Sequence, residues 1–401
     1  MGVREDFRRL RGALEQKGVD VDVVIERLTA QRIETPSWGY ANSGTRFRVF
    51  PQPGVPRTIF EKFEDAAEVH RHTGVCPGVA IHIPWDRVDD FVELTAFADS
   101  LRLHVGAINP NLFQDEDYKF GSVCHPSVHV RRRAIEHLKE CIDIAGKTHS
   151  RVLSVWLADG TNYAGQDSIR DRRARMVESL REAYAAMPAD MSMLLEYKPF
   201  EPAFYETDLF DWGSALVVCQ RLGERAKVLM DLGHHLLGTN IEQIVALLLD
   251  EGRLGGFHFN NRKYADDDLV VGSVNPMELF LIYFELTQAD ASRDTAFMID
   301  QSHNIESKIE AMIISVMNLQ EAYAKALIVD GGALATAQSD QDVLRAHGVL
   351  KDAFDTDVRP LCAYVRERLG ASPDPISAFR SSGYMEKIAA AREGGDQAGW
   401  T

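Results

Sequence analysis

Short apolar runs alternate with longer amphipathic stretches along most of the chain, from residue 33 to residue 310. The runs have the length of buried strands, whereas the stretches between them repeat apolar residues with the period of a helix. We expect strands at 33–39, 79–85, 103–109, 151–158, 191–198, 227–233, 255–261 and 297–303. A predicted helix follows each strand, and the last of these helices covers 305–327.

Strict alternation of strand and helix predicts a parallel sheet, and eight such units close naturally into a (β/α)8 TIM barrel. An open doubly wound sheet is the alternative α/β fold, but no G-x-G-x-x-G or phosphate-binding loop follows the first strand to support it. We therefore predict an N-terminal helical segment at 1–32, a catalytic barrel at 33–310, and a C-terminal helical extension at 311–401 that contacts other subunits.

Acidic residues outnumber basic ones, 60 to 44, and give a formal net charge of −16 that is spread along the chain. Such a charge argues against nucleic acid and anionic membranes as partners and suits a protein that binds cations. The five cysteines form no C-x-x-C pair, and the N-terminus lacks an apolar signal segment. No apolar run approaches the ~18 residues that span a bilayer. We expect a cytoplasmic protein.

Ionisable and aromatic side chains fall late in several predicted strands, on the side that should face the barrel lumen. Successive strand residues alternate between the lumen and the surrounding helices, so this side can be read from parity. The inward residues read in this way are His82, Trp156, Glu196, Lys198, His258 and Asp300.

Glu196, Asp231, His258 and Asp300 come from four neighbouring predicted strands. Barrel enzymes build their sites at the carboxyl ends of the strands, so these groups can converge. Three carboxylates brought close together would repel one another and stay protonated unless a multivalent cation neutralised them. The sequence therefore predicts a divalent metal site.

A second set of candidate ligands lies beside the first. His234 follows Asp231 by three residues, and Gly233 lets the chain bend so that both side chains point inward. Asp266 and Asp268 share one side of a later loop because they are two residues apart. One imidazole and two carboxylates resemble a three-ligand catalytic site, and such ligands favour Mn²⁺, with Co²⁺, Zn²⁺ or Mg²⁺ as alternatives.

Buried salt bridges are the alternative interpretation of these acidic groups. The cations that lie nearby in the sequence are only Lys198, Arg262 and Lys263. They are too few for the whole set, so the sequence favours two metal ions.

Eight motifs, in order along the chain, resemble those of the L-rhamnose isomerase family of the broad-specificity bacterial type, within the xylose isomerase-like barrel superfamily. The motifs are WGYANSGTRF, VAIHIPWD, NPNLFQDEDYKFGS, VWLADGTNYAGQ, LEYKPFEP, MDLGHH, FHFNNRKYADDDL and MIDQSHN. Each motif alone is weak, but the ordered set covers most of 33–310 and is specific.

The resemblance implies interconversion of L-rhamnose and L-rhamnulose, and of related sugars such as D-allose and D-psicose, by a hydride shift between C1 and C2. It implies a structural metal at Glu196, Asp231, His258 and Asp300 and a catalytic metal at His234, Asp266 and Asp268. It further implies a homotetramer in which Phe47, on the loop after the first strand, enters the sugar pocket of a neighbouring subunit.

The remaining roles follow from fitting this reaction to the inward residues. Water near Asp300 and Asp266 would carry the proton between O1 and O2, and Lys198 would steady the developing oxyanion. Trp85 and Trp156 offer apolar walls that exclude water. His82 is suited to bind O5 or to help open the ring. We also expect Ser302 to contact the sugar.

Two other functions compete with the isomerase. A ketose 3-epimerase of the same superfamily would use a pair of glutamates on one metal, whereas the last strand here offers Asp300 and the Asp266/Asp268 pair supplies a second site. A catalytically silent sugar-binding barrel would show gaps in the ligand set, and we find none. The preferred sugar among L-rhamnose, L-mannose, L-lyxose, D-allose and D-ribose stays open, because these differ only at stereocentres.

Overall fold

The structure is a computed structural model that describes residues 3–42, 50–201, 205–289 and 295–392. Eight parallel strands close into a barrel in the order β1-β10-β9-β8-β5-β4-β3-β2. They are β1 (Glu34–Pro36), β2 (Gly78–Ile83), β3 (His104–Pro110), β4 (Val152–Trp156), β5 (Ser192–Glu196), β8 (Ala226–Asp231), β9 (Leu254–Phe259) and β10 (Ala296–Ile299). The predicted TIM barrel is therefore confirmed.

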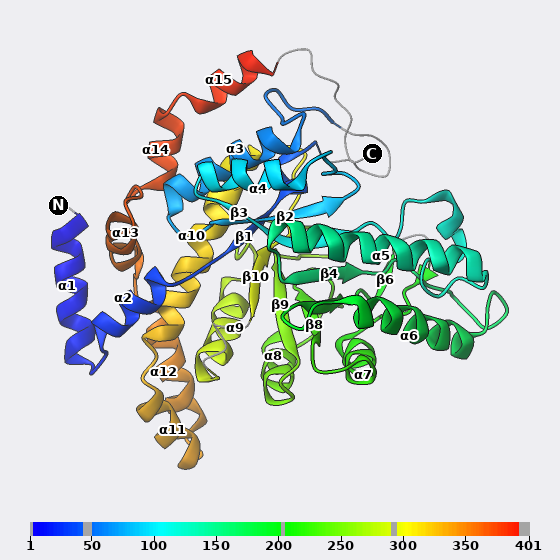
Figure 1. The fold of residues 1–401 in the computed structure, drawn as a ribbon. Coiled ribbons are helices and arrows are strands. Elements are labelled where there is room, and N and C mark those ends of the chain that lie inside the picture. The colour runs from blue at the N-terminus through cyan, green and yellow to red at the C-terminus, as the bar shows by residue number, and fades with distance from the viewer. Residues whose placement is uncertain (1–2, 43–49, 202–204, 290–294, 393–401) are drawn as a thin grey trace.

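Helices surround the barrel and follow the predicted alternation (Figure 1). They are α3 (Ile59–Thr73), α4 (Phe91–Ser100), α5 (Val128–Thr148), α6 (Ile169–Ala186), α7 (Trp212–Leu222), α8 (Ile241–Asp250), α9 (Pro276–Gln288) and α10 (Lys308–Leu327). Local sequence sets where they begin: Thr58 and Asp90 accept hydrogen bonds from the first backbone amides of α3 and α4, and α9 starts with Pro276.

The lumen is filled in layers by the residues of one parity. A small apolar cluster inside the barrel consists of Trp38, Ala80, Ala107, Leu194, Leu229 and Met298. Leu194 lies two residues before Glu196, and Leu229 two residues before Asp231, so the same strand faces that carry apolar side chains in the lumen carry carboxylates at the mouth. The register places these strand ends side by side, with Trp156 opposite Glu196 and Asp231 opposite His258.

The first two strands are shorter than predicted. β1 ends at Pro36, and the 3-10 helix η1 (Ser37–Tyr40) follows it, which contradicts the predicted strand at 33–39. This turn brings the Trp38 indole to the barrel mouth instead of continuing the strand. β2 ends at Ile83, before Pro84, so Trp85 lies on a turn rather than in the strand.

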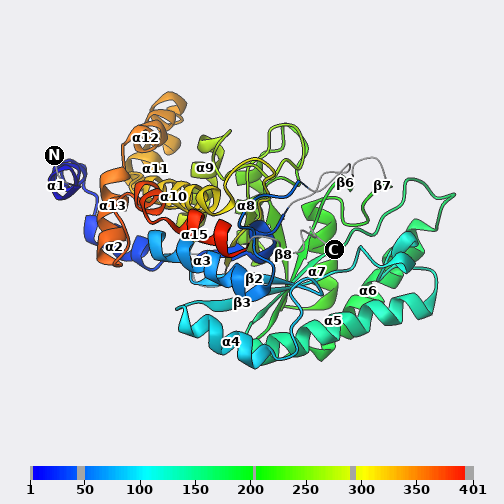
Figure 2. The same ribbon diagram turned by 90° about the horizontal axis from the view of Figure 1, so that it is seen from above.

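Helices from both ends of the chain pack together on one side of the barrel. These are α1 (Val3–Gln16), α2 (Val21–Thr29), α11 (Gly331–Ser339), α12 (Val343–Asp355), α13 (Arg359–Arg368), α14 (Pro375–Ser381) and α15 (Tyr384–Ala391). In Figure 2, α1, α2, α11, α12 and α13 lie to the left of the barrel strands. The rings of Phe7 on α1 and Tyr364 on α13 stack at 4.0 Å. Beyond α15, Arg392 anchors the extension to α3 through Asp65, at 2.9 Å.

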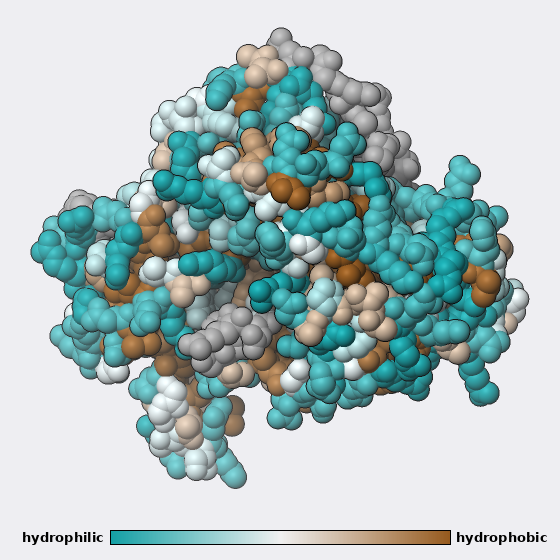
Figure 3. Space-filling view, in the orientation of Figure 1, coloured by the Kyte–Doolittle hydropathy of each residue, from teal (hydrophilic) through white to brown (hydrophobic). Residues whose placement is uncertain are grey.

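The face of the molecule in Figure 3 is mostly hydrophilic, with small separate hydrophobic areas. Among the described residues, no single helix is long and apolar enough to cross a membrane. By length and composition alone, one pair bent by 60° passes that test, α10 with α11.

Candidate functional site

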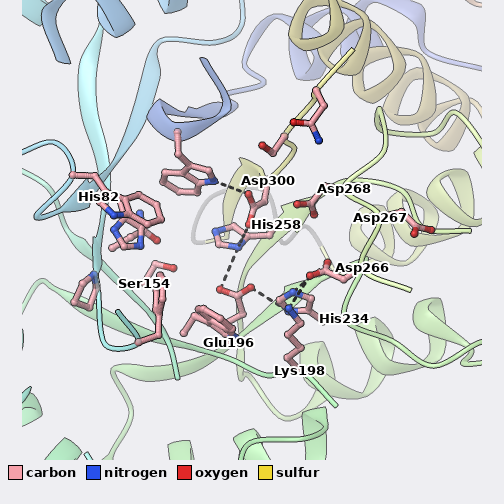
Figure 4. A pocket seen from close by; sticks show the side chains of 18 residues that line it. His82, Ser154, Glu196, Lys198, His234, His258, Asp266, Asp267, Asp268 and Asp300 are labelled. Atoms are coloured by element: carbon pink, nitrogen blue, oxygen red, sulfur yellow. Dashed lines mark hydrogen bonds and ion pairs between the residues drawn. The ribbon is translucent and has the colours of Figure 1, made fainter. Parts of the chain in front are cut away.

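A cavity of about 540 Å³ opens at the carboxyl ends of the barrel strands. Its wall includes eleven of the residues singled out from the sequence, and Figure 4 shows them converging on one space. These are His82, Trp85, Trp156, Glu196, Lys198, His234, His258, Asp266, Asp268, Asp300 and Ser302. Phe47 lies outside the residues that the structure describes.

Glu196, Asp231, His258 and Asp300 each offer one ligand atom, and these four atoms lie within 4.8 Å of one another. The imidazole of His258 is central, because its Nδ1 is 3.3 Å from Glu196 Oε2 and 3.5 Å from Asp300 Oδ2. The structure thus brings together the predicted first set of ligands.

A second group of the same kind consists of Asp231, His234 and Asp266. His234 Nε2 is 3.4 Å from Asp266 Oδ1, while its Nδ1 is 3.2 Å from Glu196 Oε1 and 3.0 Å from the carbonyl oxygen of Tyr197. Asp231 belongs to both groups, so one buried carboxylate joins the two candidate cation positions. Strand parity gives no sign of this shared role.

Asp268 differs from the sequence-based grouping, since Asp231 takes its place beside His234 and Asp266. The Asp268 side chain is turned toward Asn260, whose Nδ2 is 3.3 Å from Asp268 Oδ1 and also donates to Asp231 Oδ1 at 2.9 Å. The backbone of Asp268 is left-handed, with φ of 46°. Asp268 still lines the cavity, and its role as a ligand stays a prediction.

Position 233 requires a glycine, because two carboxylate side chains approach its Cα closely. A Cβ at this position would lie 2.8 Å from Asp266 Oδ1 and 3.1 Å from Asp231 Oδ1. The Gly233 amide donates to Asp231 Oδ1 at 2.7 Å, which leaves Oδ2 of that carboxylate for another partner. Any side chain here would push the two carboxylates apart.

Asp300 is oriented by a residue that the sequence-based reasoning missed. Trp38 Nε1 donates to Asp300 Oδ1 at 2.8 Å, so Oδ2 of Asp300 faces His258 (Figure 4). The motif WGY contains this tryptophan, but the predicted strand at 33–39 concealed the turn that aims it. Asn109, Phe113 and Ser154 also line the cavity without having been predicted; parity would have found Ser154, two residues before Trp156.

Lys198 brings a positive charge to the edge of the second group. Its Nζ is 2.8 Å from Asp266 Oδ2 and 5.2 Å from the centre of the Trp156 ring. The ammonium therefore lies between the acidic residues and the aromatic wall, where it can stabilise negative charge on a bound oxygen.

The opposite wall is aromatic. His82 stacks on Trp85 at 3.8 Å, and Phe113 contacts the ring of Trp156 at 4.7 Å. Burial lowers the pKa of His82 well below its ordinary value, which keeps the imidazole neutral. Its Nδ1 is buried and has no hydrogen-bond partner among the described residues. A neutral imidazole with a free ring nitrogen suits contact with a sugar hydroxyl or ring oxygen.

Without a cation, the acidic groups perturb one another strongly. Burial alone would lower the pKa of His234 and of His258, but nearby carboxylates outweigh this effect. Chiefly Asp231 raises the pKa of His234 to about 10. Chiefly Glu196 raises the pKa of His258 to about 9. Burial and neighbouring carboxylates raise the pKa of Asp231 to about 7. Burial likewise raises the pKa of Asp300 and Asp268. A cluster of ionisable side chains with such strongly shifted pKa values is typical of a functional site.

Several ligand atoms make no hydrogen bond, and the partners of His258 Nδ1 and Asp266 Oδ1 are other candidate ligands, which fits cation binding. Asp231 Oδ2, both ring nitrogens of His258 and Asp266 Oδ1 are buried and accept or donate no hydrogen bond within the described part of the chain. Buried polar atoms are normally satisfied, so these atoms call for a ligand. Carboxylate oxygens with one imidazole in each group suit divalent ions such as Mn²⁺, Co²⁺, Mg²⁺ or Zn²⁺.

The fold and the site together define a class: a closed parallel barrel with an acidic, histidine-containing centre at its mouth. The profile of the xylose isomerase-like TIM barrel family matches residues 65–287, more than half of the chain. The protein therefore belongs to this family.

Known proteins similar to this chain include two curated relatives. A probable sugar isomerase of Rhizobium meliloti strain 1021 is 44% identical over 396 residues, which cover 96% of this chain and 92% of that protein. A probable sugar isomerase of Mesorhizobium japonicum is 41% identical over 399 residues, 97% of this chain and 93% of that protein. The solved structure of an L-ribulose 3-epimerase matches with a TM-score of 0.53 at 17% identity, over 75% of this chain and 98% of that one. At this identity the likeness shows the fold alone.

Proposed function

We propose that the protein is a metal-dependent aldose–ketose isomerase that interconverts L-rhamnose and L-rhamnulose, and related pairs such as D-allose and D-psicose. The names of the two curated relatives support the reaction class. The choice of L-rhamnose rests on the ordered motifs of the sequence.

One observation carries the proposal: two groups of candidate ligands share the fully buried Asp231, and their other members line a single cavity with an aromatic wall. Moving a hydrogen between C1 and C2 requires that two adjacent sugar oxygens be held and polarised together. Two neighbouring cation positions, with the cavity open beside them, suit that task.

Divalent ions at these positions would polarise the sugar carbonyl and lower the pKa of the adjacent hydroxyl. The side chains then have separate duties. Asp300, 3.5 Å from His258, and Asp266, 3.4 Å from His234, would hold and pass the proton that moves between O1 and O2. Lys198, bound to Asp266, would stabilise the oxyanion that forms as this proton leaves.

The aromatic residues serve the transfer between carbons. A hydride shift is favoured by a dry environment, because water would screen the charges that polarise the two sugar oxygens. Trp156 and Phe113 form a continuous apolar face beside Lys198. His82, stacked on Trp85, would hydrogen-bond the ring oxygen and help the sugar to open. Ser302 lines the same cavity, and we assign it a contact with the sugar.

We further propose that two Mn²⁺ ions bind each subunit, that the enzyme works as a homotetramer, and that Phe47 completes the sugar pocket of a neighbouring subunit. A measured mass in solution tests the tetramer. Activity of Phe47→Ala on L-rhamnose, compared with that on sugars lacking the C6 methyl group, tests the contact from Phe47.

The direct test uses metal-stripped protein, incubated with each candidate aldose with and without Mn²⁺, followed by chromatographic separation of the sugars. We expect metal-dependent formation of the matching ketose, fastest with L-rhamnose. If no aldose yields a ketose, the isomerase proposal is wrong. Conversion of ketoses only to their C3 epimers would identify a 3-epimerase, and sugar binding without any conversion would identify a silent barrel.

A further inference from the structure

Arg172, on α6, is almost completely buried although it carries a permanent charge; 2% of the residue is exposed. Its guanidinium pairs with Asp208, with Nη2 2.8 Å from Oδ2 and Nε 3.2 Å from Oδ1. Nη1 donates to the carbonyl oxygen of Phe120 at 2.9 Å and lies 3.2 Å from Asp167 Oδ2. A buried arginine costs free energy unless it is fully paired, so this set of contacts indicates a specific structural role for Arg172.

The partners of Arg172 come from three different loops, all at the carboxyl end of the barrel. Phe120 lies in the loop after β3, Asp167 in the loop after β4, and Asp208 in the loop after β5, just past the short β-hairpin of β6 (Phe200–Glu201) and β7 (Tyr205–Glu206). One side chain therefore ties together three consecutive βα loops.

The loop after β5 holds Lys198 by its backbone. The Lys198 amide donates to the carbonyl oxygen of Leu209 at 2.9 Å, and the Thr207 hydroxyl donates to the Lys198 carbonyl oxygen. Asp208 lies between these two residues, and Arg172 fixes its carboxylate. The position of Lys198 thus depends on a segment that Arg172 anchors.

The loops after β3 and β4 are joined in the same cluster. Asp159, three residues after Trp156, accepts hydrogen bonds from the amide and the hydroxyl of Ser122, both at 2.7 Å. Its backbone carbonyl accepts from the Asp208 amide at 2.8 Å. Arg172 Nη2 lies 3.1 Å from the sulfur of Cys124 in this cluster. The three loops are therefore packed as one polar unit.

These loops and strand ends carry one wall of the candidate site: Phe113 from the loop after β3, Trp156 from the end of β4, and Lys198 after β5. Their side chains contact each other in sequence, with Phe113 on Trp156 and Lys198 over Trp156. None of these three side chains is of a type counted in the two candidate cation groups, and Lys198 Nζ lies 2.8 Å from Oδ2 of the candidate ligand Asp266.

We propose that Arg172 is a positioning residue for the reaction: its guanidinium locks the three loops so that Lys198 and the Trp156 wall keep their places beside the sugar. The catalytic part of this inference rests on the proposed function; the locking of Lys198 does not. Arginine is required because its planar fork reaches Asp208, Asp167 and the Phe120 carbonyl at once, which a lysine cannot do.

Arg172→Lys tests the proposal, with Arg392→Lys as the matched control. Arg392 is also buried and also pairs with a buried aspartate, Asp65, at 2.9 Å, but its contacts lie on α3 and at Gly54, away from the cavity. Asp208→Asn is a second variant that keeps the shape of the side chain if Arg172→Lys fails to fold. Three quantities are compared: kcat/KM with the best aldose, Mn²⁺ affinity by calorimetry, and hydrogen exchange of the Lys198 amide.

We expect Arg172→Lys to lower kcat/KM by at least about tenfold while changing Mn²⁺ affinity less than about twofold, since a small misplacement costs rate rather than metal binding. The Lys198 amide should exchange faster in this variant than in Arg392→Lys. In a Lys198→Met background the same substitution should lower the residual activity by a smaller factor than in the wild-type background, because one of the residues that Arg172 positions is gone and only the Trp156 wall is left to be misplaced.

Equal kcat/KM in Arg172→Lys and Arg392→Lys would overturn the proposal, as would a loss in the Lys198→Met background as large as that in the wild-type background. Should the wild-type protein convert no sugar, the proposed function fails, but hydrogen exchange still decides the inference. Faster exchange at Lys198 in Arg172→Lys than in the control supports it, and unchanged exchange refutes it.

Discussion

The two halves of the cavity wall are built from different strands and differ in kind. β2, β3 and β4, with the loops after them, present His82, Trp85, Phe113 and Trp156. The candidate cation ligands that line the cavity come from β5, from β9 and from the segments after β8, β9 and β10. Lys198 lies at the boundary, bound to Asp266 and over the ring of Trp156. The two halves therefore suit different tasks: one half can bind cations and the sugar oxygens, and the other can pack against the sugar carbons and exclude water.

The largest effect is expected from Asp231→Asn, because Asp231 belongs to both groups of ligands. Asparagine keeps the shape and the acceptor for the Gly233 amide but removes the charge, so both cation positions should weaken together. We expect kcat to fall by at least about 1,000-fold, since the reaction depends on cation charge. Calorimetric titration with Mn²⁺ and the isomerase assay measure both consequences. Loss of only one cation would mean that Asp231 is not shared.

His234→Ala separates the two positions. His234 belongs to the second group only, so the first cation should still bind while kcat falls by at least about 100-fold. His235→Ala is the matched control, because this neighbouring imidazole is equally buried but hydrogen-bonds the hydroxyl of Tyr197 at 2.6 Å. We expect the control to bind two Mn²⁺ ions and to keep its activity. Similar losses in the two variants would show that the effect is a folding defect.

Trp156→Leu tests the aromatic half of the cavity wall. We expect it to lower kcat/KM by about tenfold, because water that enters through the opened wall weakens the polarisation of the sugar oxygens. Solvent hydrogen should still not appear at C1 or C2, because a hydride passes directly from one carbon to the other. Binding of Mn²⁺ should be unchanged. Trp212→Leu, at the start of α7, controls for the loss of an indole outside the cavity. Altered stoichiometry of Mn²⁺ in Trp156→Leu would contradict the division between the two halves.

The smallest expected effect is a pH dependence of stability. Despite their burial, His234 and His258 have raised pKa values of about 10 and about 9 in the metal-free fold, because nearby carboxylates favour the charged form. The contribution of these two imidazoles to the stability of the fold is complete below the pKa of an unfolded histidine, about 6.5. It is lost as the pH rises through their pKa values in the folded protein. The raised pKa of Asp231, about 7, acts in the same direction.

Metal-free protein should therefore lose a few degrees of melting temperature between about pH 6 and about pH 8.5, and added Mn²⁺ should stabilise it more at the higher pH. The reason is that a cation requires neutral imidazoles and ionised carboxylates. Thermal unfolding with a chelator and with Mn²⁺ at both pH values checks this. An equal stabilisation at the two pH values would refute the coupling between protons and cations.

The fold was predictable from the sequence because alternation of strand and helix has one simple closed solution, and strand parity follows from the pleat. Parity points Glu196 and His258 into the lumen without any tertiary information. It could not show that Asp231 lies within reach of both groups, that Asp268 turns toward Asn260, or that Trp38 reaches Asp300. These depend on loop and turn conformation, which local pattern does not determine.

Arg172 illustrates a second limit. In the sequence it is one of several arginines in IRDRRAR, a pattern typical of an exposed helix face, yet it is buried among the loops. Only the packing of three loops distant in sequence reveals its role.

The central claim is that two cations share one carboxylate beside the sugar, and anomalous scattering from crystals grown with Mn²⁺ and L-rhamnose tests it most directly. The account predicts two manganese peaks per subunit, one among Glu196, Asp231, His258 and Asp300 and one beside His234 and Asp266, with Asp231 contacting both. A single peak, or a second peak that does not contact Asp231, would contradict it.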